Sequence, residues 1–140
     1  MKTTLPSAVL ILGLTLPGSA IADEYACRSL EGESPVTLDF ALRSASDAYS
    51  VTSAAFQIEG DIGYSTVASE PTALATVTGV EATSEDVRFS LHYTDANYDG
   101  DVATVHVVTL ADGAQILTAG VLRVVGGGLW PVRCEIDYEG

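Results

Sequence analysis

The sequence predicts an all-β, single-domain antiparallel β-barrel of about eight strands, and three observations support that prediction. Apolar and polar residues alternate with a period of two along most of the chain beyond residue 22, and no stretch keeps the three-and-four spacing of an amphipathic helix. Short segments rich in Gly, Asp and Ser separate the alternating stretches. Cys27 and Cys134 lie near the two ends of this region and are predicted to link its first and last strands. A two-sheet β-sandwich is the alternative.

Residues 1–22 are predicted to be a secretory signal peptide. Lys2 gives a positive start, residues 5–16 form an apolar stretch too short to span a bilayer, and Ala20-Ile21-Ala22 places small residues where a signal peptidase cleaves. A buried N-terminal helix is the alternative. Cleavage after Ala22 leaves residues 23–140, which we expect to fold as one all-β domain. We therefore expect an exported protein, either periplasmic or extracellular.

The strands are predicted from the alternation and from the turns between them. They cover residues 24–30, 35–43, 48–60, 73–83, 86–94, 101–110, 115–125 and 129–138. In the third strand the apolar positions change parity between Val51 and Phe56, which predicts a β-bulge at Ala54-Ala55. Residues 60–72 contain two glycines and a proline and are predicted to be one long connection.

Two features predict how the last strands are arranged. Asp112-Gly113 is typical of a type I′ hairpin turn, because both residues tolerate positive φ angles. Pro131 cannot donate a hydrogen bond to a neighbouring strand, which predicts that the last strand lies at an edge or a seam.

The cysteines are predicted to form a structural disulfide between Cys27 and Cys134. Export places the chain in an oxidising compartment, and the first and last strands of an up-and-down barrel are neighbours. Closing so long a loop is expected to stabilise the fold by about 4 to 5 kcal/mol in the chain-entropy model.

The charge of the chain restricts its partners. The formal net charge is −13, and Lys2 is the only lysine. Such a charge repels nucleic acid and anionic lipid, and it suits divalent cations or a basic protein. No later stretch is long and apolar enough for membrane insertion. Solubility alone is the other interpretation of this charge.

Residues 95–101 have the spacing D-x-N-x-D-G-D of a calcium-binding loop. The candidate ligands provide oxygen atoms at alternate positions and are Asp95, Asn97, Asp99 and Asp101. Position 12 of such a loop is normally a bidentate Glu and is His106 here, and the flanks are predicted strands, so an EF-hand is excluded. We expect at most weak Ca²⁺ binding, with a dissociation constant of roughly 10⁻⁴ to 10⁻³ M. A plain hairpin turn is the alternative, because Asp, Asn and Gly favour turns.

The two histidines could share one face of the same hairpin. If it closes symmetrically about Tyr98, His92 pairs with Thr104 and lies diagonal to His106. Two imidazoles on one face could hold zinc or copper, although exposed surface histidines are the simpler interpretation.

No nucleophile and base stand out in the sequence, so we predict that the protein is not an enzyme. Tyr64, in the predicted long connection, is expected either to bind a ligand or to pack over the open end of the barrel. The predicted function is a non-catalytic binding module for a small ligand or a basic protein. The alternative is a structural envelope or extracellular module that weak calcium binding at residues 95–101 stabilises.

A small exported β domain with a cysteine near each end resembles, in outline, the periplasmic C-type lysozyme inhibitors and the lipocalin-like barrels. The resemblance rests on Tyr25-Ala26-Cys27 and on Cys134. The central signature of the inhibitors is absent, so no functional residue is carried over from them.

Overall fold

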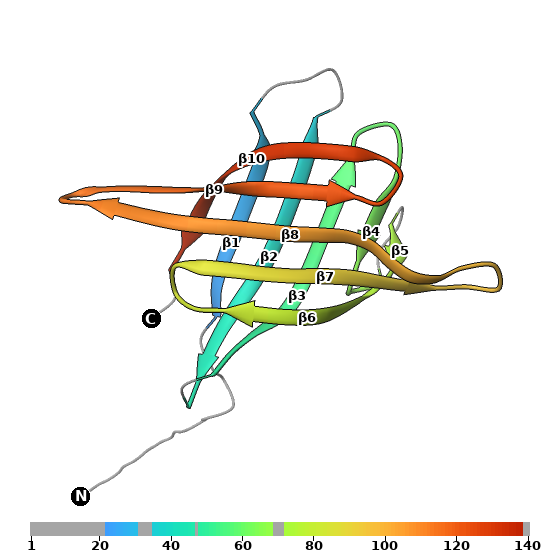
Figure 1. The fold of residues 1–140 in the computed structure, drawn as a ribbon, viewed down its shortest axis with the longest axis horizontal. Helices are drawn as coiled ribbons and strands as arrows, with labels where there is room; N and C mark the ends of the chain where they lie inside the picture. The colour runs from blue at the N-terminus through green and yellow to red at the C-terminus, as the bar shows by residue number, and fades with distance from the viewer. Residues whose placement is uncertain (1–21, 31–34, 47, 69–71, 139–140) are drawn as a thin grey trace, which may run out of the picture.

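The computed structural model describes residues 22–30, 35–46, 48–68 and 72–138, and these form one ten-stranded sheet (Figure 1). The predicted signal peptide falls almost wholly on residues 1–21, which lie outside the described residues. The strands are β1 (Ala22–Ser29), β2 (Val36–Ala45), β3 (Ala48–Ile58), β4 (Gly63–Ser65), β5 (Ala73–Leu74), β6 (Thr76–Ala82), β7 (Asp86–Thr94), β8 (Asp99–Asp112), β9 (Gln115–Val124) and β10 (Gly128–Asp137).

The sheet curls into a nearly closed barrel, which confirms the predicted fold class. The strand order is β5-β4-β3-β2-β1-β10-β9-β8-β7-β6, so most sequence neighbours are also neighbours in the sheet. The two ends of the order approach each other, because β3 also lies against β6. The strands of the described residues number ten, more than expected, because the predicted connection contains β4 and the predicted strand 73–83 is divided at Ala75 into β5 and β6.

The interior of the barrel is filled with apolar side chains. Alternate residues of most strands face inward, so that in the first half of β2 Val36, Leu38 and Phe40 are buried while Asp39 is exposed. The ring of Phe40 stacks on Tyr25 at 4.4 Å between centroids and meets Phe89 edge-on at 5.1 Å. Side chains from opposite walls of the barrel therefore meet at its centre.

The disulfide joins Cys27 of β1 to Cys134 of β10, as predicted. The two cysteines lie directly opposite each other in the antiparallel β1–β10 pair, and both are buried. This bond closes the seam between the first and last strands. A disulfide is consistent with an oxidising, extracytoplasmic location.

The β-bulge of β3 lies two residues before the predicted position. Ala41 pairs with Ser53 and Leu42 pairs with Val51, which leaves Thr52 as the extra residue. Thr52 is exposed and Ser53 is half-buried, and the regular alternation resumes with Ala54 buried. The prediction at Ala54-Ala55 was wrong because an extra residue anywhere between the two parities gives the same apolar pattern.

The predicted connection 60–72 is also partly strand. The backbone N–H of Ile58 donates to the carbonyl of Ile62 at 2.8 Å, and Gly60 adopts a φ of 77°, so the chain turns back at once. β4 then pairs antiparallel with β3, and β5 pairs parallel with β4. No helix among the described residues is long and apolar enough to cross a membrane.

Candidate functional site

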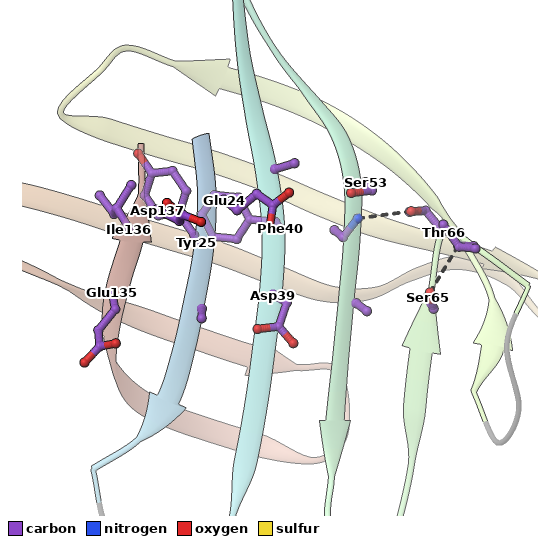
Figure 2. A pocket seen from close by; sticks show the side chains of 15 residues that line it. Glu24, Tyr25, Asp39, Phe40, Ser53, Ser65, Thr66, Glu135, Ile136 and Asp137 are labelled. Carbon is purple, nitrogen blue, oxygen red and sulfur yellow. Dashed lines mark hydrogen bonds between the residues drawn. The ribbon is translucent and has the colours of Figure 1, made fainter. Parts of the chain in front are cut away.

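The outer faces of β10, β1, β2, β3 and β4 surround a shallow hollow of about 640 Å³, which we call the acidic groove (Figure 2). Its residues face outward because their neighbours Tyr25, Phe40 and Ala54 face the core. Four carboxylates border it, from Glu24, Asp39, Glu135 and Asp137. Its floor consists of small side chains, from Ala26, Ala41, Ser53 and Ala55.

The register of the strands brings these side chains together. Across the sheet, Ala26 of β1 lies between Glu135 of β10 and Asp39 of β2. In the next row, Glu24 lies between Asp137 of β10 and Ala41 of β2. Because alanine carries only a methyl group, it leaves space between carboxylates that would otherwise be filled by longer side chains.

The electrostatics of the acidic groove favour a cation. Glu24 and Asp137 are directly opposite each other, and like charges in this position destabilise a sheet. Asp39 is the one groove carboxylate with a cationic partner, since the Arg28 guanidinium donates to it at 3.1 Å and also to the carbonyl of Cys27 at 2.6 Å. Within the described ranges, no ion pair neutralises the other three carboxylates.

One end of the acidic groove is formed by the segment that follows β4. Thr66 is fixed against β3 by two hydrogen bonds, because its N–H donates to the carbonyl of Ala54 at 2.9 Å and its Oγ1 accepts from the Ala54 N–H at 3.0 Å. The N–H of Val67 donates to the Ser65 hydroxyl at 3.1 Å (Figure 2). The side chain of Val67 is 61% exposed, so this end of the groove is apolar while the opposite end is acidic.

The predicted calcium ligands lie together in the β7–β8 hairpin, and the protein itself occupies several of their oxygens. The Asp95 Oδ1 accepts from the Asn97 backbone N–H at 2.7 Å. The Asp99 Oδ1 lies 2.7 Å from the His92 Nε2 and accepts from the Thr94 hydroxyl at 2.8 Å. Asp101, two residues after Asp99, contacts the other nitrogen of the same imidazole: its Oδ1 lies 3.3 Å from the His92 Nδ1.

His92 contacts two carboxylates of this hairpin, one through each ring nitrogen. The hydrogen bonds with Asp99 and then with Asp101 raise the pKa of His92, and His92 in turn lowers the pKa of Asp99. In the part of the chain that the structure describes, no group of three or more His, Cys, Asp and Glu side chains is placed to hold a metal ion. Calcium binding at the four oxygen-bearing residues stays a prediction, and a bound Ca²⁺ would have to displace the His92 contacts.

The histidine pairing expected from a symmetric hairpin is wrong. His92 lies opposite Asp101, and an irregularity at Val102 shifts the register of the following pairs. The tip is tighter than expected, because the N–H of Asp95 donates to the carbonyl of Tyr98 at 2.8 Å. His106 instead lies opposite Arg88 and makes its side-chain contact with Asp86, so the two imidazoles do not share a site.

Tyr64 lies in β4 and points into the barrel. Its side chain is 9% exposed, and its ring contacts Phe56 at 5.7 Å and Tyr93 at 5.1 Å. Burial is the main cause that raises the pKa of its phenol. Tyr64 is therefore part of the core, and both its binding role and its packing over the open end of the barrel stay predictions.

The acidic groove was not anticipated from the sequence, because its carboxylates come from three distant segments. The available signal was that Glu24, Asp39 and Glu135 each occupy an outward position beside small residues in a predicted strand. Comparisons of the chain with protein-family models, with curated proteins and with solved structures found no match.

Proposed function

We propose that this chain is an exported, non-catalytic binding module whose acidic groove takes a cationic ligand. The ligand would present ammonium or guanidinium groups, which either a small organic amine or a basic protein segment can supply. The observation that carries the proposal is the set of three carboxylates, from Glu24, Glu135 and Asp137, that border a hollow without a counter-ion among the described residues.

The chemistry of the acidic groove sets the kind of cation. The floor of methyl groups offers contact to an aliphatic stem, and the carboxylates above it offer contact to the charged ends. The Arg28 guanidinium on Asp39 is an intramolecular example of such a pair. A linear amine or an extended basic peptide combines both features, whereas a bare metal ion would use only the charge.

The openness of the hollow sets the expected strength of binding. An exposed ion pair contributes about 0 to 1 kcal/mol, so several pairs must form together for measurable affinity. The hollow of about 640 Å³ falls within the roughly 300 to 1,000 Å³ that is usual for ligand sites. We therefore expect a multivalent cation, modest affinity and strong dependence on salt.

The test is a titration of the purified protein with spermine and, separately, with a hexa-arginine peptide, at roughly 0.1 M and 1 M salt. The variant Glu24→Gln/Asp137→Asn removes two groove carboxylates and should weaken binding about tenfold, by the sum of two exposed pairs. The control Glu81→Gln/Glu85→Gln removes the same charge from exposed positions on β6 and the turn after it. That control should leave binding nearly unchanged.

The outcomes separate the two sources of the cation and the proposal from general charge attraction. Tighter binding of spermine identifies a small amine, and tighter binding of the peptide identifies a basic protein. Equal losses in the groove variant and in the control would show that net charge alone attracts the ligand, and the proposal would fail. It would also fail if neither probe binds at the lower salt concentration.

A further inference from the structure

Two arginines lie directly opposite each other on the outer wall of the barrel, beside the acidic groove, and we call Arg28 and Arg133 the arginine pair. Arg28 of β1 is the register partner of Arg133 of β10. Both side chains are exposed, because the adjacent Cys27 and Cys134 face the core. The chain has six Lys and Arg residues against 19 Asp and Glu residues, so two neighbouring arginines are not explained by abundance.

The charges of the arginine pair are only partly neutralised within the protein. Opposite residues in a β-sheet have Cβ atoms about 4.5 to 5.5 Å apart, and like charges in these positions destabilise the sheet. The Arg28 Nη1 donates to Asp39 at 3.1 Å and to the carbonyl of Cys27 at 2.6 Å, which uses one of the three guanidinium nitrogens. Arg133 has no ion pair among the described residues. An anion held between the two guanidinium groups would relieve their repulsion.

The arginine pair borders a hollow of about 400 Å³ that continues into the acidic groove. Ala26 and Glu135 line both hollows. Figure 2 shows Glu135 and Asp39 on the two sides of β1, in the row of the sheet that contains Ala26. Arg28 is two residues after Ala26 and on the same face of β1, which places it about 7 Å further along the strand. One ligand can therefore reach both hollows.

The outer faces of β1 and β10 carry opposite charges at their two ends. Glu24 and Asp137 lie opposite each other at one end, the arginine pair lies at the other, and Glu135 lies between them. A ligand with only a negative charge would be attracted by the arginine pair and repelled by the groove carboxylates. A ligand with only a positive charge would leave the arginine pair without a partner. A molecule that carries both charges is complementary to the whole surface.

We infer that the ligand of the acidic groove is zwitterionic. Its ammonium or guanidinium group lies among the groove carboxylates, and a carboxylate of the same molecule lies between Arg28 and Arg133. This inference rests on the proposed function and adds the chemical class of the ligand. Arginine suits the second role because its planar guanidinium binds a carboxylate through two parallel N–H bonds.

The distance between the two ends sets the length of the ligand. The arginine pair lies about 7 Å from the row of Ala26 and about 14 Å from the row of Glu24. An extended chain of six carbons spans about 7 Å, given bonds of about 1.5 Å. A free ω-amino acid has this length, and a C-terminal lysine or arginine of a protein places its side-chain cation about as far from the terminal carboxylate. These two sources share one chemistry, and the experiment separates them.

The experiment compares ligands that differ in the carboxylate, by NMR titration of the isotope-labelled full chain at roughly 0.1 M salt. One pair is hexa-arginine with a free C-terminus and the same peptide as its C-terminal amide. The other pair is 6-aminohexanoate and hexylamine. In each pair we expect the form with the carboxylate to bind about three- to tenfold more tightly, the range that two exposed ion pairs allow. It should also shift the backbone amides of Arg28 and Arg133 more than the other form does.

Two variants test whether the arginine pair causes this preference. Arg133→Gln should remove it, because only Arg28 then remains and Asp39 already holds that guanidinium. The same variant should bind the amidated peptide at least as tightly as the unaltered protein, since it loses a positive charge beside the groove. Arg123→Gln is the matched control, because it removes the same charge from an exposed position of β9 outside both hollows, and it should keep the preference. Melting curves establish that both variants fold.

The outcomes separate this inference from the proposed function. A preference for the carboxylate form in the 6-aminohexanoate pair identifies a small ω-amino acid, and a preference in the peptide pair alone identifies the C-terminus of a protein. Equal binding within each pair overturns the inference and leaves the proposed function standing, because the groove still takes the cation. Equal losses of preference in Arg133→Gln and Arg123→Gln also overturn it, because net charge is then the cause. If none of the four ligands binds, the proposed function fails and this inference fails with it.

Discussion

The long strand β8 carries a hairpin at each end, and the two hairpins differ in how they satisfy their own groups. The β7–β8 tip is held by side chains: His92 bridges Asp99 and Asp101, and the Tyr98 hydroxyl donates to the carbonyl of Asp101 at 2.6 Å. In the β8–β9 hairpin the only side-chain hydrogen bond near the tip joins Thr109 to Thr118 at 3.0 Å, considering the described residues. The side chains of the β7–β8 tip bond to groups of the same tip, and we call it the closed hairpin. The β8–β9 tip leaves apolar side chains exposed, and we call it the open hairpin.

This difference shows that a turn sequence does not by itself indicate what a hairpin is for. Both tips contain residues that favour turns, Asp95 and Asn97 in the first and Asp112 and Gly113 in the second, and both are exposed. The residues behind each tip differ: polar partners surround the first, and leucine and isoleucine surround the second. A hairpin whose polar groups are satisfied within the chain needs no partner, while an open apolar edge gains stability from one.

The largest expected effect comes from Gly120, which allows β9 to lie close against β8 below the open hairpin. A Cβ at this position would meet the backbone of His106 and of Val107. We expect Gly120→Ala to destabilise the fold by about 1 to 3 kcal/mol, because backbone atoms cannot move aside cheaply. Thermal unfolding measures the loss.

Ala119→Val is the matched control for Gly120→Ala. It adds bulk at the neighbouring, half-buried position of the same strand, on the outer face. It should change stability little. Equal destabilisation by both variants would mean that β9 resists any added volume, and the close approach at Gly120 would not be the cause.

The second effect is a pH dependence confined to the closed hairpin. The pKa of His92 is raised when the chain folds, so its contribution is present below the ordinary pKa of histidine and is lost as pH rises through the folded value. The pKa of Asp99 is lowered, so its contribution is present above the ordinary pKa of aspartate and is lost as pH falls through the folded value. The tip should be best protected between these limits.

Amide hydrogen exchange of residues 94–101 as a function of pH, corrected for the intrinsic exchange rate, measures this window. His92→Gln should abolish the loss of protection at higher pH, because glutamine does not titrate. Residues 109–117 of the open hairpin serve as an internal reference and should show no such window. A pH profile that His92→Gln leaves unchanged would contradict the role assigned to His92.

The smallest effect concerns calcium. If the predicted site at Asp95, Asn97, Asp99 and Asp101 binds Ca²⁺ weakly, a concentration equal to the dissociation constant stabilises the fold by about 0.4 kcal/mol. Binding would also lower the pKa of His92, because the ion would take its carboxylate partners. Proton NMR of the imidazole with Ca²⁺ and with chelator measures this change. An unchanged titration at millimolar Ca²⁺ would remove the calcium interpretation, and Asp99→Asn is the control.

Much of the fold was predictable because the alternation of apolar and polar residues indicates which face of a strand is buried. In residues 36–40 the apolar Val36, Leu38 and Phe40 alternate with polar residues, and these three side chains face the core. The disulfide followed from the positions of Cys27 and Cys134 near the ends of a barrel. Residues 60–72 were not predictable as a strand, because β4 is short and its neighbours are small and polar.

The candidate site was harder to predict because it depends on register between strands. The acidic groove exists only because Ala26 falls between Asp39 and Glu135, and a shift of one residue would turn one of these carboxylates toward the core. The salt bridges of His92 depend on the same kind of detail, since the irregularity at Val102 decides which aspartates it meets. Alternation within one strand carries no information on which residue lies opposite in the next.

The disulfide has a consequence for any molecule held on the outer wall of the barrel. Glu135 follows Cys134 directly, and Ala26 in the groove floor precedes Cys27. The bond therefore joins β1 and β10 on the core side of the sheet, directly beneath the outer face that carries the groove carboxylates. A ligand that needs β1 and β10 side by side binds the oxidised chain more tightly than the reduced one, and by linkage it makes the cystine harder to reduce. The fraction of protein with a ligand in the acidic groove would then depend on whether the Cys27–Cys134 disulfide is formed or reduced.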